Sequence, residues 1–98
     1  MEVIYASGVL EEVVESANYY EEEVDGLGKA FVEKVETAIE DIKNNPLMYR
    51  IIAENYRRHL LSRFPFAIVY RIEKDKLYVL AVMHLKRKPF YWRIRENR

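Results

Sequence analysis

The sequence contains no cysteine and no apolar run long enough to cross a membrane. The lack of cysteine excludes a disulfide framework and any metal site with thiolate ligands, and it fits a protein of the reducing cytosol. The longest apolar stretch spans residues 77–83, far short of the roughly 20 residues of a membrane-spanning helix. The opening residues do not join a basic region to an apolar one, so no signal peptide is indicated. We therefore expect a cytoplasmic protein with no membrane partner.

The apolar residues that are present suffice for one core. Of the 98 residues, 50% are hydrophobic, and the aromatic residues comprise eight tyrosines, four phenylalanines and one tryptophan. A disordered chain would be poorer in aromatic side chains. A chain of this length forms one domain. We therefore expect a single folded domain over residues 1–98.

Charge is distributed unevenly along the chain, although the formal net charge is zero. Residues 1–49 carry three lysines against ten glutamates and two aspartates, which leaves −9. Residues 50–98 carry nine arginines and four lysines against four acidic residues, which leaves +9. The acidic half is typical of solvated helix faces, whereas the basic half is concentrated enough to attract phosphates or an acidic partner.

Two segments have the apolar periodicity of amphipathic helices. Ser7 can cap the first helix by accepting a hydrogen bond from a free backbone N–H, and the apolar positions of that helix are Leu10, Val13, Val14, Ala17 and Val24. Residues 25–28 form a break. The apolar positions of the second helix are Leu27, Phe31, Val35, Ala38, Ile39 and Ile42. It ends at Asn44-Asn45-Pro46, because proline cannot continue the helical hydrogen bonding.

Four segments read as strands, at residues 2–6, 57–63, 66–73 and 77–84. The polar residues 73–76 between the last two predict an antiparallel hairpin. The predicted order is β-α-α-β-β-β. We therefore expect an α+β fold in which a helical hairpin packs on one face of an antiparallel sheet.

The tail over residues 85–95 alternates cations with aromatic side chains. This pattern suits contact with phosphates and stacking on bases, but the same segment could equally dock on the core through Phe90 and Trp92.

Tyr19 and Tyr20 are interpreted as helix packing. The acidic pairs and runs on the first helix are interpreted as solvent-facing charge; they are Glu11-Glu12 and Glu21-Glu22-Glu23.

Several motifs occur in the order found in a known family. They are Asn18-Tyr19-Tyr20-Glu21, Gly26-Leu27-Gly28 followed by Phe31, Asn45-Pro46 followed by Tyr49, Arg57-Arg58-His59-Leu60, Phe64-Pro65-Phe66-Ala67-Ile68-Val69-Tyr70-Arg71, Val79-Leu80-Ala81-Val82-Met83-His84, Lys86-Arg87-Lys88-Pro89 and Trp92. The ordered set covers nearly the whole chain and resembles the RelE/ParE family of toxins, also called plasmid-stabilisation proteins. The resemblance implies a helical hairpin packed on a curved antiparallel sheet, and a cognate antitoxin that wraps a segment over the toxin.

The resemblance leaves two activities open. ParE-like members inhibit DNA gyrase, whereas RelE-like members cleave messenger RNA in the ribosomal A site. Metal-free RNA cleavage needs a base for the 2′-hydroxyl, cations at the scissile phosphate and an acid for the leaving oxygen. In RelE-like nucleases, basic residues of the central strands and a C-terminal tyrosine or similar group supply these functions.

This chain matches the nuclease pattern only in part. Three residues before Tyr70, where the nucleases place a phosphate-binding arginine, it has Ala67, whose methyl group cannot hold a phosphate. The run 66–68 instead resembles ParE-like members. Cationic character is retained on the preceding strand at Arg57, Arg58 and His59.

If the chain were RelE-like, the catalytic residues would be Arg58, His84, Arg87 and Tyr91. Arg87 matches the arginine after the last strand, and Tyr91 lies near the catalytic tyrosine position, which aligns closer to Trp92 or Arg93. His84 could act as an acid or base, although a histidine at a strand end is more often packed or hydrogen bonded. Two histidines without suitably spaced carboxylates do not make a metal site, so we expect no metal and no cofactor.

The leading hypothesis is a ParE-like toxin that binds DNA gyrase and is neutralised by a cognate antitoxin. The alternative is a ribosome-dependent messenger RNA endonuclease, and a third hypothesis is a homologue that has lost toxicity. An antitoxin segment should cover the basic sheet face around Arg58, Arg63 and Arg71, and also the groove of the helical hairpin. The predicted binding residues are Arg57, Arg58, Arg63, Arg71, Lys86, Arg87, Lys88, Trp92 and Arg93.

Overall fold

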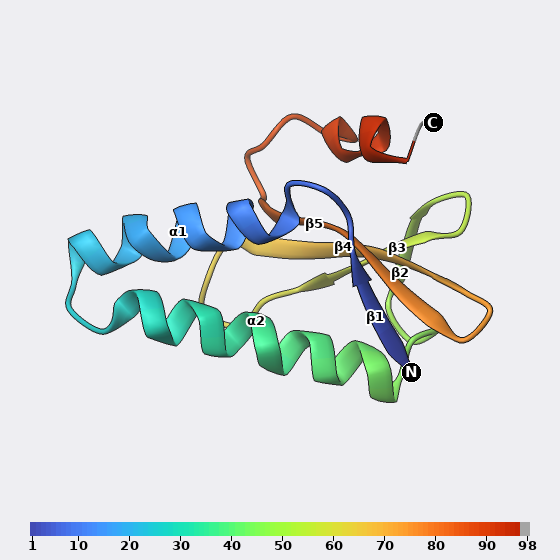
Figure 1. The fold of residues 1–98 in the computed structure, drawn as a ribbon, viewed down its shortest axis with the longest axis horizontal. Coiled ribbons are helices and arrows are strands. Elements are labelled where there is room, and N and C mark those ends of the chain that lie inside the picture. The colour runs from blue at the N-terminus through green and yellow to red at the C-terminus, as the bar shows by residue number, and fades with distance from the viewer. Residues whose placement is uncertain (97–98) are drawn as a thin grey trace.

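Two helices pack on a five-stranded sheet, and a short 3-10 helix follows the last strand (Figure 1). The computed structural model describes residues 1–96. The elements in chain order are β1 (Glu2–Tyr5), α1 (Val9–Glu23), α2 (Leu27–Asn44), β2 (Arg50–Ala53), β3 (Tyr56–Leu60), β4 (Phe66–Glu73), β5 (Lys76–His84) and η1 (Tyr91–Arg95). This is the predicted α+β fold, with one strand more than the sequence pattern indicated.

The strands lie in the order β1-β5-β4-β3-β2. The pairs from β2 to β5 are antiparallel, and the β4–β5 hairpin is confirmed. Its turn residues Lys74 and Asp75 have φ values of 53° and 62°, as a tight hairpin turn with two left-handed positions requires. β1 runs parallel to β5, with Val3 opposite Leu77, so the sheet is mixed rather than wholly antiparallel. The two strands are distant in the chain, and no tight turn imposes the antiparallel direction on them.

The start and the end of the β2–β3 hairpin differ from the prediction. β2 has only four residues and no clear alternation of apolar and polar side chains, so its pattern does not identify it as a strand. β3 ends at Leu60 and not at Arg63, because the chain turns there. The Leu61 N–H donates to the Phe66 carbonyl at 2.9 Å, and Arg63 has a φ of 75°.

The first helix begins one residue later than predicted. Its N-cap is Gly8, with a φ of 91°, and no side chain caps it, so the predicted role of Ser7 is wrong. Ser7 lies one residue before the observed cap. The cap position has a left-handed backbone conformation, which glycine adopts more readily than serine. The predicted apolar stripe of α1 is also partly wrong, since Leu10, Val14 and Val24 are exposed. The side chains that α1 directs to the core are Val9, Val13, Ala17 and Tyr20.

The second helix follows the prediction closely. Its buried residues are Gly28, Phe31, Val35, Ala38, Ile39 and Ile42. Gly28 allows the two helices to approach, because a Cβ at this position would lie 2.5 Å from the Ala17 carbonyl oxygen. The Glu21 carboxylate accepts hydrogen bonds from the Gly26 and Gly28 N–H groups at 2.8 Å and 3.0 Å. These two hydrogen bonds lower the pKa of Glu21, and they satisfy backbone donors at the start of α2.

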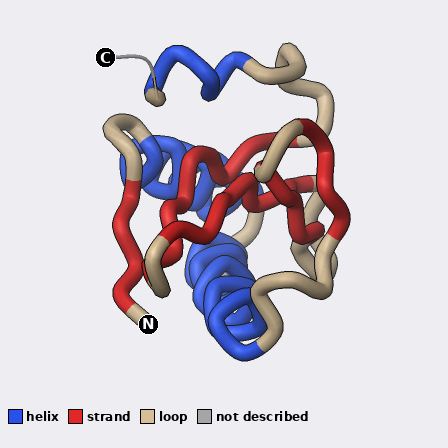
Figure 2. The backbone as a smooth tube through the Cα atoms, turned by 90° about the vertical axis from the view of Figure 1, so that its right-hand side faces the viewer, coloured by secondary structure: helices blue, strands red, loops and turns tan. Residues whose placement is uncertain are grey.

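The two faces of the sheet carry separate apolar clusters. The inner face packs on α1 and α2 around an aromatic group in which the Phe31 ring lies 4.8 Å from Phe66 and 5.2 Å from Phe64. Tyr20 joins this group, 4.9 Å from Phe64, as predicted. Tyr19 is 61% exposed and packs only edge-on against the Tyr20 ring, at 5.4 Å. The second cluster lies on the other face. Figure 2 shows the C-terminal segment on the side of the sheet opposite α2.

Candidate functional site

The candidate site is the outer face of the sheet, defined here as the face turned away from the helices, together with the C-terminal segment that partly covers it. Trp92 is only 1% exposed and packs against Val69, Leu80 and Ala81 of the central strands. The Tyr56 ring meets the Trp92 ring edge-on at 4.8 Å. Of the two alternatives for the tail, docking on the core is therefore the one realised at Trp92.

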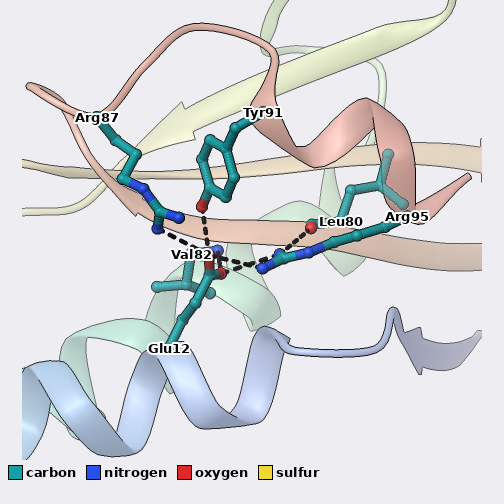
Figure 3. Close-up of polar contacts among 6 residues, drawn as sticks. All are labelled: Glu12, Leu80, Val82, Arg87, Tyr91 and Arg95. Atoms are coloured by element: carbon teal, nitrogen blue, oxygen red, sulfur yellow. Dashed lines mark hydrogen bonds and ion pairs between the residues drawn. The ribbon is translucent and has the colours of Figure 1, made fainter.

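Glu12 of α1 fastens the C-terminal segment to the fold (Figure 3). Its carboxylate accepts hydrogen bonds from Arg95 at 2.9 Å and 3.2 Å, from Arg87 at 3.4 Å, and from the Tyr91 hydroxyl. The backbone N–H of Val82 in β5 donates to the same carboxylate at 3.1 Å. We call Glu12, Arg87, Tyr91 and Arg95 the Glu12 cluster. The prediction that Glu12 faces solvent is wrong, since its side chain is only 11% exposed.

The Glu12 cluster forms where the sheet has an unpaired edge. β1 ends at Tyr5, opposite Val79, so β5 continues beyond the reach of its parallel neighbour. Two backbone groups on this edge would otherwise lack a partner. The Val82 N–H donates to Glu12, and the Leu80 carbonyl accepts from Arg95 at 2.8 Å. A carboxylate and a guanidinium group thus take the place of a further strand.

The chemistry of Tyr91 and Arg87 follows from this cluster. Burial raises the pKa of Tyr91 above its ordinary value, and the hydrogen bond to Glu12 raises it further. The Arg87 guanidinium lies 3.8 Å from the centre of the Tyr91 ring. A tyrosine that donates to a carboxylate and resists ionisation is poorly suited to act as a base, and Arg87 is already paired with an anion. Two of the four predicted catalytic residues are therefore engaged within the fold.

Two further predicted binding residues are held by acidic side chains on the outer face. Arg71 donates to Glu96 at 2.6 Å and to Glu73 at 2.6 Å, and the hydrogen bond with Glu96 raises the pKa of Arg71. Arg93 donates to Glu54 at 2.8 Å. These ion pairs attach the C-terminal segment to β4 and to the β2–β3 turn. Sequence reasoning missed Glu12, Glu54, Arg95 and Glu96. No local pattern signals them, because their partners lie 25 or more residues away in the chain.

The basic residues of β3 lie on different faces. Arg57 is opposite Tyr70 on the inner face, where it donates to the carbonyls of Leu47 at 3.0 Å and Tyr49 at 2.8 Å. His59 is also on the inner face, stacked on Tyr49 at 3.9 Å and 3.5 Å from an Asp41 carboxylate oxygen. Arg58 is opposite Val69 on the outer face. Only Arg58 of the three is directed toward the candidate site.

The remaining predicted residues lie around the far end of the sheet. Arg63 is in the β3–β4 loop and borders a hollow with α2, so it does not share the outer face with Arg58 and Arg71. Lys86 and Lys88 are exposed in the loop after β5. His84 is opposite Phe66 on the inner face, and its Nδ1 accepts from the Lys86 N–H at 3.0 Å. His84 and Arg58 therefore lie on opposite faces and do not converge on one phosphate.

The outer face contains one small, mostly apolar pocket. Ala67 contributes to its base and is 1% exposed, while Trp92 and Phe90 of the C-terminal segment form part of its wall. Arg58 is the cation that lines it.

Among residues 1–96, no group of three or more histidine, cysteine, aspartate or glutamate side chains is placed to hold a metal ion. Over the same residues, no helix is both long and apolar enough to cross a membrane.

Comparison with known proteins identifies the family and supports the fold. A family model described as "ParE toxin of type II toxin-antitoxin system, parDE" matches residues 3–89. The chain is similar to a chain of the chromosomal ParDE TA system from P. aeruginosa, with a TM-score of 0.61 and 14% identity over 86% of this chain and 95% of that chain. At this identity the likeness shows the shared fold. None of the curated proteins matches the sequence. Because the family model spans nearly the whole sequence, the chain belongs to the family of ParE toxins of type II toxin–antitoxin systems.

Proposed function

We propose that this toxin arrests growth in the cytoplasm by binding DNA gyrase, and that a cognate antitoxin neutralises it by covering the outer face. The observation that carries the proposal is the Glu12 cluster. It holds Arg87 and Tyr91, two of the residues that a nuclease would need, in ion pairs and hydrogen bonds within the fold. A toxin that acts by binding protein does not need these groups to be free.

Two further observations support binding over RNA cleavage. Ala67 lines an apolar pocket at the position where a nuclease of the resembled family would hold phosphate with an arginine. Arg58 and His84 lie on opposite faces of the sheet. General acid–base catalysis requires its groups within hydrogen-bonding reach of one substrate. His84 and Arg87 line one hollow beside α1 together with Glu12, which accepts from Tyr91, but Arg58 lies on the other face of the sheet. The predicted catalytic set therefore lacks its strand arginine at that hollow.

The test follows cells induced for the toxin alone. Incorporation of labelled precursors into DNA and into protein is measured separately over the first minutes. We expect DNA synthesis to fall first while translation continues, and we expect the purified toxin to inhibit supercoiling by gyrase. An early collapse of translation, with cleaved messenger RNA on the ribosomes, would reject the proposal in favour of the nuclease alternative. Normal growth of induced cells would indicate a homologue that has lost toxicity.

A further inference from the structure

The small pocket of the outer face lies where β4 carries a short side chain, Ala67. Leu60, Ala67 and Met83 are neighbours across β3, β4 and β5. The alanine leaves a depression in this row, and the C-terminal segment closes one side of it. The resulting cavity of about 130 Å³ is lined by Ile52, Arg58, Ala67, Val69, Met83, Leu85, Pro89, Phe90 and Trp92.

The size and lining of the pocket define what it can hold. A dry apolar cavity of about 150 Å³ holds a molecule of the size of benzene, so this pocket fits one leucine-sized side chain. Three exposed apolar residues lie on the same part of the outer surface, namely Leu60, Leu85 and Phe90, with exposed fractions of 49%, 44% and 42%. An apolar centre that accepts an anchoring side chain is the usual arrangement of a protein interface.

The charges beside the pocket are positive, and the two arginines among them have no ion-pair partner in residues 1–96. Arg50 is directly opposite Arg58 in the β2–β3 pair, so both side chains project from the outer face. No acidic group in residues 1–96 forms an ion pair with either of them. The loop that carries Leu85 and Pro89 adds the exposed Lys86 and Lys88. Nearby acidic residues do not compensate, because Glu54 and Glu96 pair with Arg93 and Arg71.

We propose that this pocket binds one leucine-sized side chain of an acidic peptide segment of a protein partner, whose carboxylates pair with Arg58 and Arg50. Two like charges placed side by side repel each other, and a carboxylate between them would relieve the repulsion. Arginine also forms bidentate hydrogen bonds with carboxylates. The inference rests on the proposed function only in assuming a protein partner, and it does not depend on which protein the toxin arrests.

A nucleic acid fits this site less well. Recognition of single strands uses exposed aromatic rings on which bases stack. Trp92 is buried and its ring is covered by Tyr56, and the exposed Phe90 ring already has the Arg93 guanidinium 5.0 Å from its centre. The phosphate backbone of a nucleic acid would also form no favourable contact with the apolar floor of the pocket at Ala67. The pocket and the cations together select for a ligand with an apolar side chain flanked by acids.

The test uses Trp92, which is the only tryptophan of the chain and lines the pocket. A short synthetic peptide with one leucine flanked by aspartate and glutamate is titrated into the full-length protein, and tryptophan emission is followed. We expect saturable binding that weakens about tenfold when alanine replaces the leucine of the peptide, and about tenfold in the Arg58→Gln variant, as for the loss of one charge-assisted hydrogen bond. The exposed Lys29→Gln variant on α2 has the same change of charge and should bind within about twofold of the original protein.

A second variant tests the pocket itself. Ala67→Val should fill the depression and weaken binding of the leucine peptide while binding of the alanine peptide changes little; circular dichroism verifies that the variant folds. Equal affinity for the leucine and alanine peptides would overturn the proposal, because charge alone would then explain binding. Tighter binding of a single-stranded oligonucleotide of equal charge would also overturn it. The growth experiment tests the gyrase proposal independently of the pocket. Loss of DNA synthesis without peptide binding would refute only the pocket proposal. Peptide binding together with an early fall in translation would refute only the gyrase proposal.

Discussion

The Glu12 carboxylate accepts a hydrogen bond from the hydroxyl of Tyr91, 79 positions further along the chain. This contact joins the first helix to the C-terminal segment across the free edge of β5. The same carboxylate also pairs with Arg87 and Arg95. One side chain of α1 therefore binds three residues of the segment that covers part of the outer face.

Replacement of Glu12 should weaken the fold and loosen the C-terminal segment. In Glu12→Ala, the Val82 N–H loses its acceptor and the partly buried Arg95 loses its anionic acceptor, although it keeps the Leu80 carbonyl. Leaving one partner of such a pair uncompensated costs about 3 kcal/mol of unfolding free energy. The matched control is Glu11→Ala, an exposed neighbour that should change stability by less than about 0.5 kcal/mol. Urea denaturation monitored by circular dichroism measures both variants. Equal stability of the two would show that the cluster contributes nothing to the fold.

Adjacent arginines of β3 should have different roles. Arg57→Ala removes hydrogen bonds to the carbonyls of Leu47 and Tyr49, so we expect a loss of about 2 kcal/mol of unfolding free energy. Arg58→Ala removes a side chain that forms no ion pair with any residue of the described range 1–96, and we expect a change within about 0.5 kcal/mol. Chemical denaturation of the two variants side by side checks this difference. A larger loss for Arg58→Ala than for Arg57→Ala would contradict the assigned faces.

Stability should fall at alkaline pH because of Tyr70. Its hydroxyl donates to the Pro46 carbonyl at 2.7 Å, and burial raises the pKa of Tyr70 to about 12. The folded state then retains a proton that the unfolded chain releases near pH 10, so the stabilisation is complete below pH 10 and is lost as the pH rises toward 12. We expect this group to account for about 2 kcal/mol over that range. Urea midpoints at pH 9, 10 and 11 test it, and the slope should be shallower in Tyr70→Phe.

The contact between the two helices should tolerate no side chain at Gly28. In Gly28→Ala the added methyl group would lie 2.5 Å from the Ala17 carbonyl oxygen, so the helices must separate, at a cost of about 2–3 kcal/mol. Gly26→Ala is the comparison, because no atom lies within 4 Å and only the positive φ of 85° is strained. That strain costs about 1–2 kcal/mol. Thermal denaturation ranks the two variants, and the reverse order would contradict the close approach at Gly28.

Local patterns were sufficient to predict most of the fold. The stripe of α2 and the β4–β5 hairpin both follow from spacing and turn residues, and the structure confirms them. β2 escaped prediction because four residues with mixed exposure carry no period. The first cap was misplaced because glycine replaces a side-chain cap with backbone freedom, which the pattern around Ser7 does not reveal.

The candidate site was harder to predict because its contacts are not local. Glu12 and Glu11 are identical in type and adjacent, and only the arrival of Arg95 and Tyr91 from the other end of the chain distinguishes them. Arg57 and Arg58 were grouped as one basic patch, although strand alternation sends them to opposite faces. The side chains of β3 that face the helices can be identified only from the position of the helices, and the residue pattern of β3 does not contain that information.

The partial closure of the outer face by residues 91–95 has a consequence for synthesis. A chain emerges from the ribosome N-terminus first, so α1 leaves long before Arg95 has been made. Until then Glu12 is exposed to water, and Val69 and Ala81 lack the covering ring of Trp92. The surface proposed to bind partners is thus completed only after both helices and all five strands have been made, and a nascent chain that ends before Trp92 does not present it in finished form.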